Sequence, residues 1–302
     1  MQNWTDIFFT SRDGLRLYAR HYPVPGSVRR PVVCLAGLTR NARDFHDLAV
    51  ALATQDDAGR DVYAIDSRGR GRSQNDPDWK NYTIITELHD VLDFMAMKGL
   101  SRAGIIGTSR GGLIALLMAS LRPCAMGAVV LNDIGPVIER DGLSRIVAYV
   151  GRIPLPADWK EATALVAGMN RRYFTNVPDE QWEEVARQQF NDENGLPAPA
   201  YDPRLSRAIS LMDGPMPQLW PQFSALGHVP VLAIRGENSD ILSAKTLAEM
   251  RNRHPRLEAV TVRGQGHAPL LKDSATIGAV ADFLARADAE AFADAPPLLA
   301  LA

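Results

Sequence analysis

The sequence predicts an α/β protein with a mostly parallel sheet that helices cover on both faces. Short apolar runs recur along the chain, and each returns only after a connection long enough to hold a helix. Strands that are apolar on both sides are typical of buried parallel sheets, because both faces of such a sheet are covered. The runs lie at 32–35, 62–65, 104–106, 128–131, 231–234 and 259–262.

An antiparallel hairpin is expected before this parallel pattern begins. Two alternating segments, 7–10 and 15–22, are joined through Asp13-Gly14, a dipeptide that favours tight turns between strands. One helix between the apolar runs is clearly marked by an apolar stripe over 88–95, with Gly99 where a helix would end. A second amphipathic helix is expected over 276–286, after the last strand.

The strand pattern is interrupted over 136–223, where prolines, tryptophans and charged residues accompany helical stretches at 159–170 and 179–190. We interpret this region as an inserted helical cap, with residues 1–135 and 224–302 forming the core. The aromatic residues of the insertion either line a substrate pocket or fill the cap's own small core. They are Trp159, Tyr173, Phe174, Trp182, Phe190, Tyr201 and Trp220.

Composition excludes several classes of partner. The 302 residues are 46% hydrophobic and 23% charged, as in soluble globular proteins. Lys plus Arg is 33 and Asp plus Glu is 35, so a net charge of −2 provides no general attraction for nucleic acid or anionic lipid. No metal-ligand motif is present, and we expect neither a metal nor another cofactor.

The chain is expected to be cytoplasmic. Its first residues carry charges before any apolar run, unlike a signal peptide, and no apolar stretch reaches the about 18 residues of a membrane span. Cys34 and Cys124 lack metal-ligand spacing and are expected to be reduced packing residues. The oligomeric state is open, a homo-oligomer included, and the apolar tail over 291–302 either frays or contacts a second subunit.

The sharpest local signal is the motif Gly107-Thr108-Ser109-Arg110-Gly111-Gly112, directly after a strand run and directly before the helical run 113–121. This Gly-x-Ser-x-Gly pattern between strand and helix is typical of a turn that raises a nucleophilic serine. Any side chain at Gly107 or Gly111 is expected to collide where the chain doubles back. Ser109 is therefore the candidate nucleophile.

A serine hydroxyl is a weak nucleophile, so it needs a base and a group that orients the base. Of six histidines, His267 alone lies in a glycine-flanked loop between a strand and the last helix. Asp240 follows the strand run 231–234, and Asp133 follows the run 128–131. All of these positions fall at the carboxyl ends of strands, where open α/β sheets form their sites. We prefer Asp240 as the acid and keep Asp133 as the alternative. The other histidines, His21, His46, His89, His228 and His254, are interpreted as surface or packing residues.

These motifs make the chain similar to the α/β-hydrolase superfamily, over nearly all of its length outside the cap and tail. Ser109, Asp240 and His267 follow the family's order of nucleophile, acid and histidine. The segment 66–73, Asp-Ser-Arg-Gly-Arg-Gly-Arg-Ser, looks like the family's Asp-x-Arg-Gly-x-Gly-x-Ser turn, and 132–136 resembles its junction into the cap. The resemblance implies an eight-stranded, mostly parallel sheet with a helical cap.

The same resemblance implies an oxyanion hole, in which main-chain N–H groups stabilise the negative oxygen of a tetrahedral intermediate. The family's oxyanion loop matches 35–41, so its donors would be the N–H groups of Leu38 and Arg110. The arginines of the turn at 66–73 are interpreted as an ion-paired or solvated structural feature, because the spacing lacks the third glycine of a dinucleotide fingerprint.

The implied activity is hydrolysis of a small-molecule carboxylic ester through an acyl-enzyme, as in the serine carboxylesterases of this superfamily. A serine at position 109 disfavours the branches that use an aspartate nucleophile. A carbon–carbon bond hydrolase for vinylogous diketones from ring cleavage is the main alternative, since it uses the same triad. A ligand receptor that retains the hydrolase shell is a second alternative. The length of the acyl chain and the size of the alcohol are left open.

Overall fold

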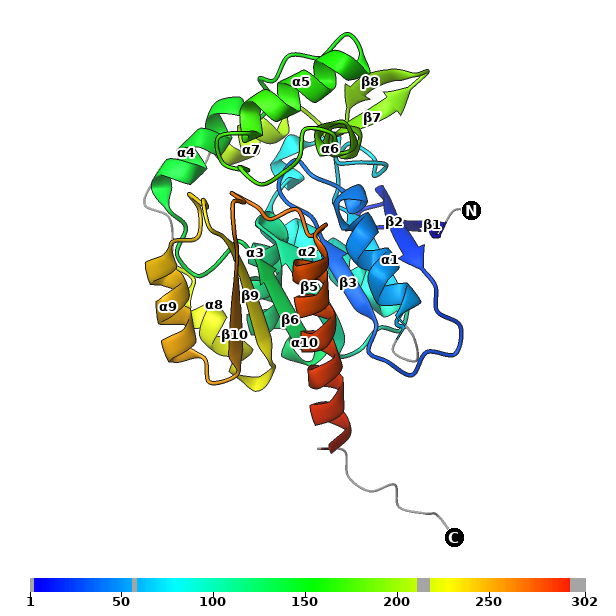
Figure 1. Ribbon diagram of the computed structural model, residues 1–302. Helices are drawn as coiled ribbons and strands as arrows, with labels where there is room; N and C mark the ends of the chain where they lie inside the picture. Colours follow the sequence, from blue (N-terminus) through cyan, green and yellow to red (C-terminus); the bar gives the residue numbers. More distant parts are fainter. Residues whose placement is uncertain (1–2, 56–58, 211–217, 294–302) are drawn as a thin grey trace.

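The computed structural model describes residues 3–55, 59–210 and 218–293. It has the eight-stranded, mostly parallel sheet that the sequence analysis predicts, in the order β1-β2-β4-β3-β5-β6-β9-β10 (Figure 1). The first two pairings, β1 with β2 and β2 with β4, are antiparallel, and every later pairing is parallel. The strands are β1 (Thr5–Thr10), β2 (Arg16–Tyr22), β3 (Val32–Leu35), β4 (Val62–Asp66), β5 (Ala103–Thr108), β6 (Met126–Asn132), β9 (Val231–Gly236) and β10 (Leu257–Val262).

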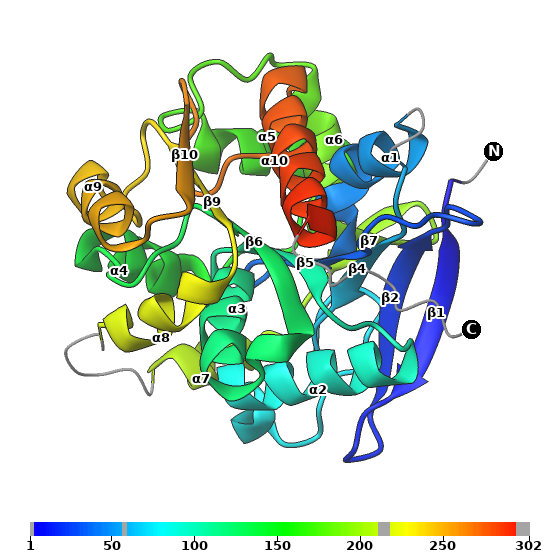
Figure 2. The same cartoon turned by 90° about the horizontal axis from the view of Figure 1, so that it is seen from below.

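Helices cover both faces of the sheet, which explains the continuous apolar runs of the strands. Alternate residues of β3 face opposite sides: Val33 and Leu35 pack with α2 and α3, whereas Val32 and Cys34 pack with α1 and α10. Figure 2 shows α1 and α10 on one side of the strands and α2 and α3 on the other. These helices are α1 (His46–Thr54), α2 (Ile84–Met97), α3 (Arg110–Leu121) and α10 (Ser274–Ala293).

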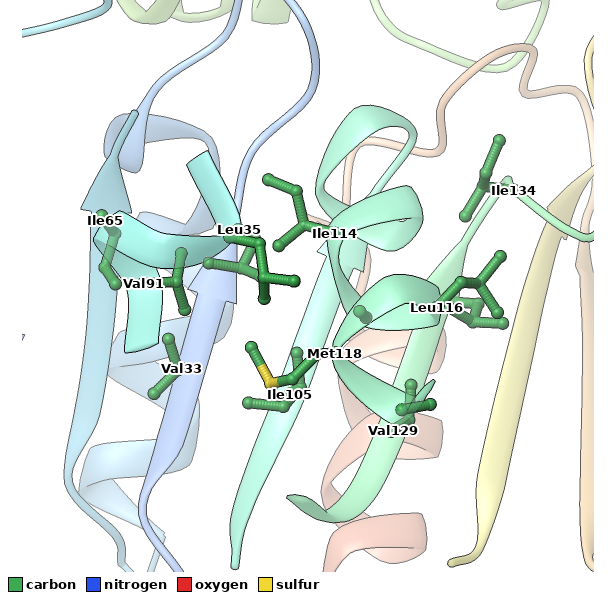
Figure 3. Packing of buried hydrophobic residues seen from close by; sticks show 14 of the residues in the cluster. Val33, Leu35, Ile65, Val91, Ile105, Ile114, Leu116, Met118, Val129 and Ile134 are labelled. Carbon is green, nitrogen blue, oxygen red and sulfur yellow. The ribbon is translucent and has the colours of Figure 1, made fainter. Parts of the chain in front are cut away.

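Helix α3, which follows the serine motif, packs on the same face of the sheet as α2. Met118 of α3 lies beside Ile105 of β5, and Leu116 of α3 belongs to the same buried cluster as Val129 of β6 (Figure 3). Full burial of such side chains contributes about 1.5–3 kcal/mol each relative to exposure. The amino-terminal end of α3, which carries the motif, is therefore held by a well-packed core.

Most of the chain between β6 and β9 lies over the carboxyl ends of the parallel strands (Figure 1). It has a small apolar core of its own, centred on Phe174 and Trp182. The division into a core of 1–135 and 224–302 and a cap of 136–223 stays a prediction. The elements are α4 (Arg140–Tyr149), α5 (Trp159–Asn170), α6 (Gln181–Gln189), β7 (Phe190–Glu193), β8 (Leu196–Pro199), α7 (Leu205–Ser210), and α8 (Trp220–Ser224), which packs on α3 below the others.

Polar contacts fasten this insertion to the loops beneath it. The side-chain amide of Asn41 donates to the carbonyl of Gln188 at 2.9 Å, and Arg43 donates to the same carbonyl and to that of Phe190. Lys272, in the loop before α10, reaches Glu184 of α6. Several separate loops thus hold the insertion in place above the sheet.

The two cysteines differ in exposure. Cys34 is fully buried in β3, where burial raises the pKa of its thiol. Cys124 is exposed, so the expectation that both are packing residues is wrong for this one, which follows α3 in a short 3-10 turn at the surface. Both are free thiols.

Among the described residues, no helix is long and apolar enough to cross a membrane. The predicted tail lies mostly outside the described residues, which end at 293.

Candidate active site

Ser109 occupies a strained turn between β5 and α3. Its backbone has φ 51° and ψ −114°, a region that side chains rarely adopt and that costs about 1–3 kcal/mol. A Cβ at Gly107 would lie 2.5 Å from the nitrogen of Gly112, and a Cβ at Gly111 would collide with the carbonyl oxygen of Leu35. Both glycines are therefore required sterically, as predicted, and the turn lifts the hydroxyl to the edge of the sheet.

The loop that carries His267 and the one that carries Asp133, the alternative acid, converge at this serine. The Nε2 atom of His267 lies 2.8 Å from the Oγ atom of Ser109. The Nδ1 atom of the same ring lies 2.8 Å from Oδ2 of Asp133. With Nδ1 donating to the carboxylate, Nε2 is left as the acceptor for the serine proton, which is the arrangement that a general base requires.

Asp133 is built into the end of β6 by its own set of donors. The backbone of Asp133 has φ 55°, which turns the side chain out of the strand direction, and the carboxylate is fully buried. The N–H of Gly236 donates to Oδ1 at 2.8 Å, and the hydroxyl of Ser239 donates to Oδ2 at 2.6 Å. These hydrogen bonds hold the carboxylate against His267.

Asp240 does not contact His267 through either ring nitrogen, so the preference for Asp240 over Asp133 is wrong as a matter of geometry. Its Oδ2 accepts from Nε of Arg145 at 2.6 Å, and its Oδ1 accepts from the second guanidinium nitrogen at 2.8 Å. Burial raises the pKa of Asp240, but the hydrogen bonds and charge of Arg145 outweigh it and hold the pKa below the usual range. The two aspartates follow neighbouring strands, β6 and β9, and strand patterns do not distinguish which of two such turns faces the imidazole.

Asn132, just before Asp133, joins two of the converging loops. Its side-chain amide donates to Oγ1 of Thr108, before the serine, and to the carbonyl of Pro269, beyond the histidine. Its own carbonyl accepts from the N–H of Ser109 at 3.0 Å. The sequence analysis did not identify Asn132, Ser239 or Arg145 as site residues. For Ser239 a signal was available, because it lies next to Asp240 in the same loop.

Leu38 lines the same cavity as Ser109, and Arg110 follows the serine directly. Leu38 lies in a turn closed by a hydrogen bond from the N–H of Arg40 to the carbonyl of Gly37, and Arg110 begins α3. Within the described ranges, no protein group accepts a hydrogen bond from the main-chain N–H of either residue. Two such donors beside a nucleophile could bind an oxyanion, and the positive end of the dipole of α3 would add to their effect.

A cavity of about 480 Å³ opens above the serine and the histidine. The turn that contains Leu38 forms one wall, and side chains of the segment between β6 and β9 form much of the rest. Of the seven predicted aromatics, Phe174, Trp182, Phe190 and Tyr201 line it, together with Tyr149, which sequence reasoning missed. Trp159, Tyr173 and Trp220 are not among its lining residues. Most of the lining is apolar, which suits a small organic substrate. Across the ranges that the structure describes, no three His, Cys, Asp or Glu side chains are grouped to hold a metal ion.

A model of the α/β-hydrolase fold family matches residues 30–274. The chain belongs to this family. A 3-hydroxybutyrate-oligomer hydrolase from Cupriavidus necator is 32% identical to it over 285 residues, covering 89% of this chain and 93% of the relative. A 2-(acetamidomethylene)succinate hydrolase from Mesorhizobium japonicum is 27% identical, over 76% of this chain and 79% of that one. The crystal structure of an α/β hydrolase from Novosphingobium aromaticivorans has a TM-score of 0.87 and 39% identity, covering 95% and 99% of the two chains. The protein is thus an enzyme of the hydrolase class.

Proposed function

We propose that this hydrolase cleaves small-molecule carboxylic esters through an acyl-enzyme intermediate, with Ser109 as nucleophile, His267 as general base and Asp133 as the orienting acid. The observation that carries the proposal is the continuous pair of 2.8 Å hydrogen bonds from Ser109 through His267 to Asp133 at the base of the cavity. A serine hydroxyl on a strained turn has little structural value of its own, so its pairing with an oriented imidazole favours a catalytic role.

In the first half of the reaction, Oγ of Ser109 attacks the ester carbonyl while Nε2 of His267 takes the hydroxyl proton. The carbonyl oxygen becomes an anion, which the N–H groups of Leu38 and Arg110 would stabilise. His267 then gives its proton to the leaving alcohol. In the second half, His267 activates a water molecule that releases the acid and restores the serine. Asp133 keeps the imidazole in one tautomer and stabilises its protonated form throughout.

Esters of short hydroxy acids are a reasonable substrate class to test first. The Cupriavidus necator relative is named as a hydrolase of 3-hydroxybutyrate oligomers, and this chain covers 93% of its length. In such an oligomer the units are joined as esters. The largely apolar cavity is large enough for one or a few such units, and main-chain N–H donors beside Ser109 suit their carbonyl oxygens.

The decisive test is the variant Ser109→Ala. Because every step requires the nucleophile, we expect kcat to fall on the order of a millionfold, with the free energy of unfolding within about 1 kcal/mol of wild type. Turnover should be followed on p-nitrophenyl esters of increasing acyl length and on 3-hydroxybutyrate oligomers. Residual ester hydrolysis at a substantial fraction of the wild-type rate would contradict the assignment.

The same panel separates the alternatives. A vinylogous diketone substrate, included beside the esters, would be cleaved faster than any ester by a carbon–carbon bond hydrolase. A receptor would turn over neither substrate, and its serine would react only weakly with a fluorophosphonate probe. For the proposed esterase, we expect rapid labelling of wild type by the probe and none of Ser109→Ala.

A further inference from the structure

A buried carboxylate near Ser109, that of Glu87, has no part in the proposed mechanism. Glu87, in the first turn of α2, is only 1% exposed. Its two oxygens accept hydrogen bonds from two arginines of different segments, Arg70 in the turn after β4 and Arg110 at the start of α3. Each of these arginines is connected to one half of the predicted oxyanion hole.

The first connection is through Arg110, which follows the nucleophile directly. Its Nε donates to Oε2 of Glu87 at 2.7 Å, and one terminal nitrogen donates to Oε1 at 3.0 Å and to the carbonyl of Tyr82 at 2.9 Å. A planar guanidinium held at both edges has little freedom to rotate. The side chain of Arg110 therefore fixes the residue whose main-chain N–H is one of the two predicted oxyanion donors.

The second connection is through Arg70, in the turn after β4. One of its terminal nitrogens donates to Oε1 of Glu87 at 2.7 Å, and its Nε donates to the carbonyl oxygen of Leu38 at 2.8 Å. Leu38 provides the other predicted oxyanion donor, in a short turn with no regular secondary structure. Arg70 is itself fully buried, so its charge requires the carboxylate beside it.

We propose that Glu87 is a positioning residue for catalysis, in which one buried carboxylate sets the spacing of the two oxyanion donors by holding Arg70 and Arg110 together. The inference rests on the proposed function, because it concerns how that site stabilises its transition state. Glu87 touches no substrate; it acts through the two arginines.

Charge explains why a carboxylate is needed at this position. Burial raises the pKa of Glu87, but Arg110 and Arg70 outweigh burial and keep the pKa below the usual range, so the group is ionised. A glutamine there has one acceptor oxygen instead of two, and its NH₂ group would face a guanidinium that has only donors. Glu87→Gln should therefore release one arginine while changing the volume of the side chain very little.

The experiment compares Glu87→Gln with Asp90→Asn. Asp90 lies on the same helix, is 2% exposed, and accepts two hydrogen bonds of 2.7 Å from Arg68. No hydrogen bond joins Asp90 itself to Arg70 or Arg110 in the described part of the chain. Its partner Arg68 meets Arg70 through the main-chain carbonyl of Arg68, which accepts from a terminal nitrogen of Arg70 at 2.7 Å. Asp90 therefore matches Glu87 in burial and pairing without holding either arginine of the oxyanion hole directly. Arg68 keeps Asp76 as a buried partner in this control.

Two readouts distinguish positioning from stability. The first is kcat and KM on a p-nitrophenyl ester; the second is the inhibition constant of a trifluoromethyl ketone, which adds to the serine and places an oxyanion in the hole. We expect Glu87→Gln to lower kcat about 10- to 100-fold, with KM within about threefold, and to weaken ketone binding by a factor similar to that for kcat. Asp90→Asn should lower Tm but leave both kcat and ketone affinity within about threefold of wild type.

The inference is overturned if folded Glu87→Gln keeps wild-type kcat and ketone affinity, or if Asp90→Asn reduces both as much. Should Glu87→Gln fail to fold, Arg110→Met takes its place, because it removes the guanidinium and retains the main-chain N–H; the same 10- to 100-fold loss in kcat and ketone affinity is expected, and no loss overturns the inference. Wild-type protein that hydrolyses no ester and does not bind the ketone would overturn the proposed function, and this inference with it.

Discussion

The loops after β6 and β9 each place an aspartate at the same edge of the sheet, yet the two carboxylates have different surroundings. Asp133 is fully buried and accepts from a main-chain N–H, a hydroxyl and the imidazole of His267. The side chain of Asp240 is 23% exposed and forms a two-point ion pair with Arg145. The charge of Asp240 is therefore balanced by a guanidinium, whereas that of Asp133 is held by neutral donors and stays available to the imidazole. The hydrogen-bond partners of each carboxylate therefore indicate its role better than its position along the chain does.

The largest expected effect concerns which aspartate orients the base. Asp133→Asn should lower kcat about 10⁴-fold, because the amide would favour the wrong tautomer of His267. Asp240→Asn, the matched change in the neighbouring loop, should lower kcat less than about tenfold. The measurement is kcat on the best ester of the panel, with circular dichroism to confirm folding. A larger loss for Asp240→Asn than for Asp133→Asn would reverse the comparison.

A smaller effect is expected from the hydroxyl that supports the buried carboxylate. Ser239 donates to Oδ2 of Asp133, the oxygen that also meets the imidazole, so Ser239→Ala should lower kcat about tenfold, as the loss of one hydrogen bond to a charged group implies. Ser243→Ala is the control. Ser243 caps the amino-terminal end of α9 (Ala244–Arg253), four residues further along, and its loss should cost about 1 kcal/mol of stability with kcat unchanged. Equal losses of kcat in the two variants would show that the effect of Ser239→Ala comes from a general disturbance of the loop and not from the lost hydrogen bond to Asp133.

The smallest effect concerns the ion pair between Arg145 and Asp240. Both side chains are partly exposed, so a double-mutant cycle of Arg145→Met and Asp240→Asn in urea unfolding should give a coupling of about 0.5–1 kcal/mol at pH 7. The folded-state pKa of Asp240 is lowered, so this stability is present above the usual aspartate pKa of about 4 and is lost as the pH falls through the folded-state value. A coupling at pH 3 as large as that at pH 7 would exclude the charge of Asp240 as its source.

The fold could be predicted largely because its signals are local. The apolar runs identify strands that are covered on both faces, and the glycines around Ser109 identify a turn that admits no side chain at two positions. The predicted stretch 159–170 coincides with α5, whose amino-terminal end is capped by Asp158. Each of these features depends on neighbours within about one turn or one strand of the chain.

Side-chain pairing across the sheet edge could not be predicted in the same way. Asp133 and Asp240 follow adjacent strands, and the choice between them depends on φ at Asp133 and on Arg145, which comes from the insertion. The connection of Leu38 to Arg110 through Arg70 and Glu87 brings together four separate segments with no shared periodicity. Such contacts depend on the assembled tertiary structure.

The contrast between the two thiols has a practical consequence. Cys124 lies just beyond the carboxyl-terminal end of α3, while Ser109 lies just before its first residue, so a maleimide dye attached at Cys124 sits about 18 Å along the helix from the nucleophile. Cys34 becomes reactive only when the centre of the sheet opens. The protein therefore has one thiol, Cys124, at which a fluorophore can be attached away from the nucleophile. The rate at which the other thiol, Cys34, reacts would report the rate of global unfolding.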